Sequence, residues 1–86
     1  MLAGDVDAST SQGEPVEITL NGAGTNISYT IVSDPLHGGL GKLIVNKVIY
    51  TPEADFTGDD MFTYRVKDQC GQTADATVTI HVATQK

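Results

Sequence analysis

Residues 60–66 read Asp60-Met61-Phe62-Thr63-Tyr64-Arg65-Val66. From Phe62 onward, apolar side chains alternate with Thr and basic side chains. Successive side chains of a β-strand point to opposite faces, so this alternation is typical of a strand with one buried face and one solvent-exposed face. The stretch therefore predicts a half-buried strand that carries Tyr64 on its inner side.

The spacing around Tyr64 resembles the strand that carries the tyrosine corner in immunoglobulin domains. In that strand an acidic residue precedes the tyrosine by four positions, as Asp60 does here, and an inward residue follows two positions later. The tyrosine ring packs inward and its hydroxyl bonds to upstream backbone. The resemblance implies that Val66 takes the place of the usual cysteine, with Ile18 as its partner on an earlier strand, and that Asp60 supports the corner.

Six further segments show short apolar alternation on either side of this strand. They cover residues 5–10, 16–20, 27–32, 40–45, 48–50 and 76–82. Turn residues separate them, at 21–24, 34–39, 46–47 and 68–72, and a longer connection covers 55–60. About seven strands at this spacing predict an all-β, two-sheet antiparallel, immunoglobulin-like Greek-key sandwich.

Composition supports strands and bounds the size of the protein. The chain has 86 residues, enough for one domain, and it contains 11 Thr, 8 Val and 6 Ile, whose branched side chains favour sheets. The formal charge is −6, from 11 acidic and 5 basic residues. Such an acidic surface repels phosphate, so we expect neither nucleic acid nor an anionic membrane as a partner.

The single cysteine, Cys70, excludes an internal disulfide bond. No apolar run approaches the roughly 20 residues that a membrane span requires. We expect residues 1–86 to form one monomeric module cut from a longer secreted or cell-surface protein, with Met1 as an added initiator.

Several segments together resemble the bacterial immunoglobulin-like, cadherin-like tandem repeats of surface and secreted proteins. Residues 50–68 look like the most recognisable stretch of that family, and residues 33–40, 13–20 and 77–82 are similar to other parts of it. The resemblance implies a non-catalytic module whose neighbours are other modules of the same chain. It also implies an extracellular location and, in some relatives, calcium or polysaccharide binding. The family usually has glycine directly after the position of Asp68, whereas here Gln69 and Cys70 precede Gly71.

Three carboxylates in one connection, Asp55, Asp59 and Asp60, are the candidate calcium ligands. Calcium takes six to eight oxygen ligands, which loop carboxylates and carbonyls can supply. The spacing lacks the repeated Asp pattern of an EF-hand loop. A structural interpretation is favoured, in which Asp55 caps the turn, Gly58 takes a positive φ and Asp60 supports the corner. Three more acidic residues form a weaker candidate cluster, namely Asp5, Asp7 and Asp34.

Catalysis is not expected. His37 and His81 have no zinc-type spacing to Cys70, and Cys70 lies in a short turn with neither histidine near it in sequence. Carbohydrate binding would need calcium or polar contacts, because the chain has no Trp and most of its aromatic residues lie on inward phases. Asn26-Ile27-Ser28 matches a glycosylation acceptor, which we interpret as a coincidence.

Two functions remain. The first is a structural or adhesive spacer module. The alternative is a calcium-assisted carbohydrate-binding module, with polysaccharide or another surface protein as its partner.

Overall fold

The structure, a computed structural model, describes residues 2–23 and 26–84. Its described part contains strands and no helices. The strands are β1 (Leu2–Gly4), β2 (Val6–Ser11), β3 (Val16–Thr19), β4 (Asn21–Ala23), β5 (Ser28–Ser33), β6 (Gly38–Leu40), β7 (Lys47–Pro52), β8 (Gly58–Lys67) and β9 (Thr73–Ala83).

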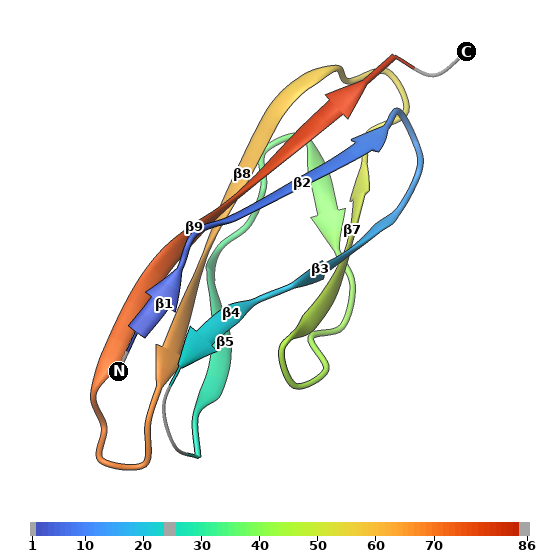
Figure 1. The fold of residues 1–86 in the computed structure, drawn as a ribbon. Coiled ribbons are helices and arrows are strands. Elements are labelled where there is room, and N and C mark those ends of the chain that lie inside the picture. Colours follow the sequence, from blue (N-terminus) through green and yellow to red (C-terminus); the bar gives the residue numbers. More distant parts are fainter. Residues whose placement is uncertain (1, 24–25, 85–86) are drawn as a thin grey trace.

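The strands form two main sheets, a four-stranded one in the order β2-β9-β8-β5 and a three-stranded one in the order β3-β7-β6 (Figure 1). The short strands β1 and β4 pair with each other. Apolar side chains of both main sheets meet in one core. This arrangement confirms the predicted all-β immunoglobulin-like sandwich.

The first strand differs from the prediction in both number and direction. The chain pairs β1 with β4, passes Asp5, and then pairs β2 with β9. The β2–β9 ladder is parallel, with Val6 opposite Val78 and Ser11 opposite Ala83, so the sandwich is not antiparallel throughout. The N-terminal segment thus pairs first with β4 and then with β9, so it forms two strands, β1 and β2, where one was predicted.

The second predicted strand corresponds to β3, and a further short strand, β4, follows it directly. Residues 21–24 were expected to break the strand, but β4 begins at Asn21. Gly22 makes this possible, because a Cβ atom at that position would lie 2.8 Å from the Tyr29 hydroxyl and 2.9 Å from Val66 Cγ2. No residue larger than glycine fits between these side chains without moving them.

Three boundaries near the middle of the chain also move. Gly38 and Gly39, predicted as loop, lie in β6, whereas residues 41–45 of the predicted strand lie outside it. The tight turn is at Val45 and Asn46, one residue earlier than expected, and the Ile44–Lys47 bridge closes it. Residues 58–60, predicted as connection, begin β8. Alternation does not mark these ends, because backbone pairing extends past the last buried side chain.

The core lies mainly between β8 and β9 on one side and β7 and β3 on the other. Every second residue of β8 from Asp60 to Val66 is buried, and β9 shows the same period. Tyr50 and Tyr64 are the largest side chains with no exposed surface. Val66 and Ile18 both belong to this core cluster.

The domain is elongated, with principal extents of 47 × 18 × 16 Å and a radius of gyration of 13.3 Å. A compact chain of this length has a radius of gyration of about 12 Å. The N-terminal strand β1 and the C-terminal end of β9 lie at opposite poles of the long axis (Figure 1).

Candidate functional site

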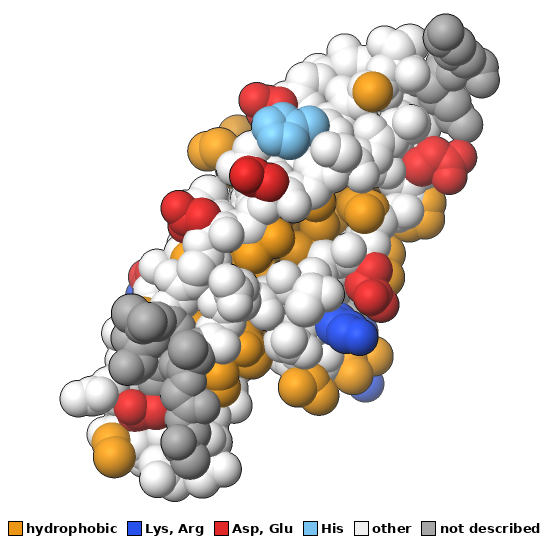
Figure 2. Space-filling view, viewed as in Figure 1, with side chains coloured by type: hydrophobic (Ala, Val, Ile, Leu, Met, Phe, Trp, Pro, Cys, Tyr) orange, Lys and Arg blue, Asp and Glu red, His pale blue; other side chains and the backbone are white. Residues whose placement is uncertain are grey.

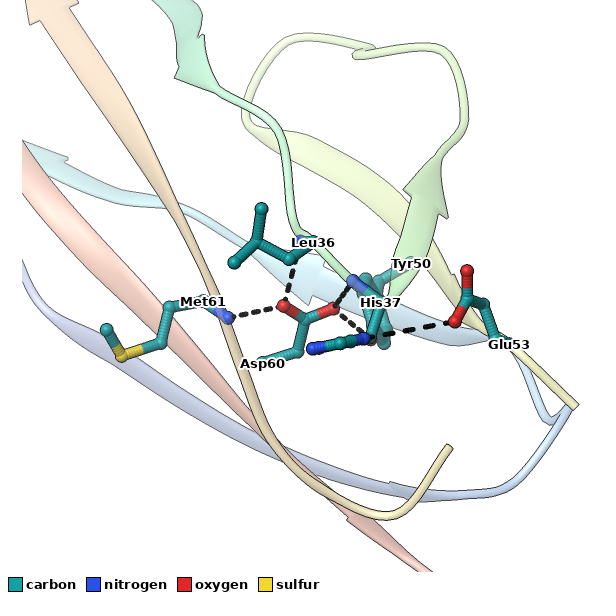
Figure 3. Close-up of polar contacts among 6 residues, drawn as sticks. All are labelled: Leu36, His37, Tyr50, Glu53, Asp60 and Met61. Atoms are coloured by element: carbon teal, nitrogen blue, oxygen red, sulfur yellow. Dashed lines mark hydrogen bonds and ion pairs between the residues drawn. The ribbon is translucent and has the colours of Figure 1, made fainter. Parts of the chain in front are cut away.

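The most polar point of the interior is the side chain of Asp60, which is 3% exposed. Asp60 lies on the inner face of β8, in the same phase as Phe62 and Tyr64. It projects toward the segment that leads into β6 and toward Tyr50 of β7 (Figure 3). A buried carboxylate is costly unless it is fully hydrogen-bonded, so its partners determine whether it serves the fold or a ligand.

Both oxygens of Asp60 are occupied by protein donors. Oδ1 accepts hydrogen bonds from the backbone N–H of Leu36 at 3.0 Å and of Met61 at 2.9 Å. Oδ2 accepts from the His37 N–H at 3.0 Å and from the Tyr50 hydroxyl at 2.7 Å. Asp60 therefore joins the four-stranded sheet to the three-stranded sheet and to the segment that crosses between them.

Asp60 does not support Tyr64 in the way that the sequence suggested. Four residues of strand span about 13 Å at 3.3 Å per residue, so a carboxylate at position 60 cannot reach the hydroxyl of Tyr64. The structure pairs Asp60 with Tyr50, on the facing sheet. Gly58, two residues earlier, has a φ of 122°, which favours glycine at the start of β8.

The hydroxyl of Tyr64 has backbone partners on both short strands. It donates a hydrogen bond to the carbonyl of Gly4 in β1, and it accepts one from the Asn21 N–H in β4 at 3.1 Å. Tyr29 adds a second contact to β4, because its hydroxyl accepts from the Gly22 N–H at 3.2 Å. These two tyrosines hold the β1–β4 pair against the end of the core.

Tyr50 and Tyr64 have pKa values above the ordinary value for tyrosine. Burial, followed by the hydrogen bond to Asp60 and the charges of Asp60 and Glu53, raises the pKa of Tyr50. Burial also raises the pKa of Tyr64, partly offset by its backbone hydrogen bonds. In both cases the neutral phenol is the form that the fold accommodates.

These shifts predict alkaline unfolding. A phenol whose pKa is raised by folding contributes stability that is present below the unfolded pKa of about 10 and is lost as the pH rises above it. We expect the melting temperature to fall above about pH 10, with tyrosinate absorbance of Tyr50 and Tyr64 appearing together with unfolding. Ionisation of Tyr50 and Tyr64 near pH 10 in a protein that remains folded would contradict this expectation.

The predicted calcium ligands do not converge. Asp60 is saturated by protein donors, Asp59 points outward and lies 2.7 Å from His81 Nδ1, and Asp55 lies in the exposed turn before β8. Within residues 2–23 and 26–84, no group of three or more His, Cys, Asp or Glu side chains could hold a metal ion. In the weaker cluster, Asp5 accepts a hydrogen bond from the Thr77 N–H at 3.0 Å, which places it in a structural contact at the edge of β9.

The residues considered for catalysis lie apart in the fold. His37 stacks on Phe56, with ring centroids 4.2 Å apart and an angle of 8° between the planes. His81 pairs with Asp59 on the outer face of β9. Cys70 is exposed in the β8–β9 turn, where the Asp68 carboxylate accepts the Cys70 N–H at 2.9 Å. The described contacts do not link the cysteine to either histidine.

A carbohydrate platform is also missing, since all five Phe and Tyr side chains are described and each is at least partly buried. Asn26, the residue of the glycosylation-like triplet, has a φ of 53° and donates a side-chain hydrogen bond to Gln69 at 3.0 Å. The described residues form no helix that is both long and apolar enough to cross a bilayer.

Sequence reasoning missed the role of Tyr50 as the partner of Asp60. It also missed the Gly4 and Asn21 backbone groups that bind Tyr64. No spacing rule could have linked them, because Gly4 and Tyr64 are 60 positions apart in the chain.

Comparisons with known proteins agree with this architecture. The family described as "Bacterial Ig domain" matches residues 2–81. Protein GAMETE EXPRESSED 2 of Arabidopsis thaliana is 44% identical over 62 residues, which cover 72% of this chain and 7% of that protein.

Among solved structures, an endo-fucoidan hydrolase from glycoside hydrolase family 107 superimposes with a TM-score of 0.64 at 16% identity. A substituted form of that enzyme gives the same values. The match covers 95% of this chain and 13% of the enzyme chain. At this identity the likeness concerns the fold, and the chain spans a small part of each of these longer proteins.

Proposed function

The chain belongs to the bacterial Ig domain family, and on that basis we propose that it is a non-catalytic spacer module of an extracellular multidomain protein. The family supports a structural or adhesive module, and its members are typically non-catalytic parts of extracellular proteins. The observation that carries the spacer role is the placement of the two ends at opposite poles of a domain 47 Å long. Modules joined through such ends add their lengths.

The terminal strands support this proposal by their direction. β2 and β9 are parallel neighbours over six residue pairs, and the Gln12 N–H extends the ladder by donating to the Ala83 carbonyl at 3.0 Å. Tension applied to the two ends of the chain runs along both strands in opposite senses. It therefore loads the ladder in shear, so that many hydrogen bonds must break together rather than one after another.

A pair of proline variants tests the mechanical role of the β2–β9 ladder. Backbone N–H groups alternate in direction along a strand, so the Ala8 N–H has the same direction as that of Gln12 and donates to β9, whereas the Asp7 N–H points away. We expect Ala8→Pro to lower the unfolding force in single-molecule pulling of a tandem array and to cost about 1–3 kcal/mol of stability. Asp7→Pro, the matched control, should keep most of both.

Equal unfolding forces for the two variants, or a wild-type force as low as that of a ladder that opens pair by pair, would refute the spacer proposal. The alternative, a calcium-assisted polysaccharide module, is tested on the same protein by adding calcium. It requires a rise in melting temperature at millimolar calcium together with shifts of the amides of Asp55, Asp59 and Asp60.

A further inference from the structure

Residues 41–47, which we call the finger, form a projecting hairpin that runs from the end of β6 to the first residue of β7. Backbone hydrogen bonds keep it closed, from the Gly41 N–H to the Ile49 carbonyl at 2.8 Å and in both directions between Ile44 and Lys47. Yet its tip is apolar, since Ile44 is 63% exposed and Val45 is 78% exposed. The finger is thus an ordered surface that presents hydrophobic side chains to solvent.

Val45 is held in an unfavourable backbone conformation. Its φ is 58°, a left-handed value that is a genuine outlier for a β-branched residue and is unfavourable for it. Asn or Gly would relieve this strain and would suit an exposed turn better. An apolar, strained residue at an exposed tip serves the fold poorly, which points to a contact outside the domain.

The finger is also basic on an acidic protein. It carries Lys42 and Lys47 and no acidic residue, whereas the whole chain has 11 acidic and 5 basic residues. Glu17, at the base of the finger, shares with both lysines a shallow hollow of about 210 Å³. Figure 2 shows basic and apolar side chains together on this projecting hairpin.

A second surface, which we call the groove, combines apolar side chains with acidic ones. It lies where β5 leaves β8, after the register shift between Ile31 and Ser33, and it has a volume of about 460 Å³. Its lining includes two exposed apolar side chains, Leu36 at 84% and Met61 at 54%.

The charge of the groove is opposite to that of the finger. Asp34 and Asp59 are exposed carboxylates in its lining, and Asp60 lies buried at its floor. Asp59 is paired with His81, and His37 is the other titratable side chain of the lining. The lining contains no Lys or Arg.

We infer that the finger of one copy of this module docks in the groove of a second copy. Ile44 and Val45 would cover Leu36 and Met61, while Lys42 and Lys47 would face Asp34 and Asp59. Finger and groove are different surfaces of the same chain, so the contact is heterologous and joins copies head to tail instead of closing a symmetric pair.

A hairpin tip in a groove buries less than a standard interface, so a single contact should be weak and transient. Several modules on one chain, facing several on another, would multiply such contacts through their high effective concentration. The spacer proposal rests on the placement of the two ends and on the β2–β9 ladder within one module, whereas this contact joins two copies. Absence of the contact would therefore leave the spacer proposal intact.

The first test uses charge. We expect amide shifts of the finger and of the groove to change together as the concentration of the 86-residue protein rises to the millimolar range, and to reverse with added salt. Lys47→Glu should reduce this self-association at least tenfold. Lys67→Glu, which makes the same change of charge at the far end of β8, is the control and should reduce it far less.

The second test separates binding from folding. Val45→Asn should raise the melting temperature, because Asn tolerates a positive φ, and at the same time abolish the concentration-dependent shifts. Opposite changes in stability and association cannot come from unfolding. Asp34→Lys mixed with Lys47→Glu should restore association between the two variants.

Three results would overturn the inference. They are shifts confined to other surfaces, equal effects of Lys47→Glu and Lys67→Glu, and a Val45→Asn protein that still associates.

Discussion

Asp60→Ala is expected to lower the free energy of unfolding by about 3–5 kcal/mol, a large part of the roughly 5–15 kcal/mol available to a small domain. The substitution removes both acceptor oxygens and leaves four donors without a partner. Each buried donor that loses its acceptor costs about 1–3 kcal/mol, although water entering the space lowers the sum. Urea unfolding followed by circular dichroism measures the change.

Asp59 provides the control for this prediction, since it is the adjacent residue and its carboxylate is exposed beside His81. Asp59→Ala should cost less than about 1 kcal/mol, because exposed ion pairs contribute little. Asp60→Asn should fall between the two, since an amide retains one oxygen but turns an N–H toward existing donors. Equal losses for Asp59→Ala and Asp60→Ala would show that Asp60 does not join the two sheets.

Tyr64→Phe is expected to cost about 2–3 kcal/mol while leaving the core packing intact. The variant retains the ring and removes the hydroxyl that binds the Gly4 carbonyl and the Asn21 N–H. Two partly buried backbone groups then lose their partner, each at a cost of about 1 kcal/mol or more. Hydrogen exchange should show faster exchange in β1 and β4, because this hydroxyl hydrogen-bonds both strands to β8.

Tyr29→Phe is the matched control, since it removes a hydroxyl that accepts one hydrogen bond, from the Gly22 N–H. Its expected cost is about 1 kcal/mol or less. If Tyr64→Phe were no more costly than Tyr29→Phe, the corner hydroxyl would have no special part in holding the β1–β4 pair.

The candidate site could be predicted only in part from the sequence. Alternation places Asp60 and Tyr64 on one face of a strand, because side chains of the same parity share a face. It cannot name their partners. Asp60 bonds to Tyr50 on the facing sheet and to backbone N–H groups of the segment that leads into β6. Tyr64 bonds to β1 and β4, so each partner depends on how separate segments pack.

The three acidic residues show the same limit. Asp55, Asp59 and Asp60 are close in the chain, yet one lies in a turn, one faces solvent and one is buried. In a strand, neighbouring residues point in opposite directions, so adjacency in sequence separates Asp59 from Asp60 instead of bringing them together.

The amino-acid sequence by itself determined the sandwich class, the alternation of the strands and the burial of Tyr64, Val66 and Ile18, because these follow from local periodicity and β-branched composition. Tertiary structure alone decided the parallel β2–β9 pair, the β1–β4 ladder and the partners of Asp60. These features join segments that are distant in the chain, and their geometry depends on the packing of whole sheets, which no local pattern encodes.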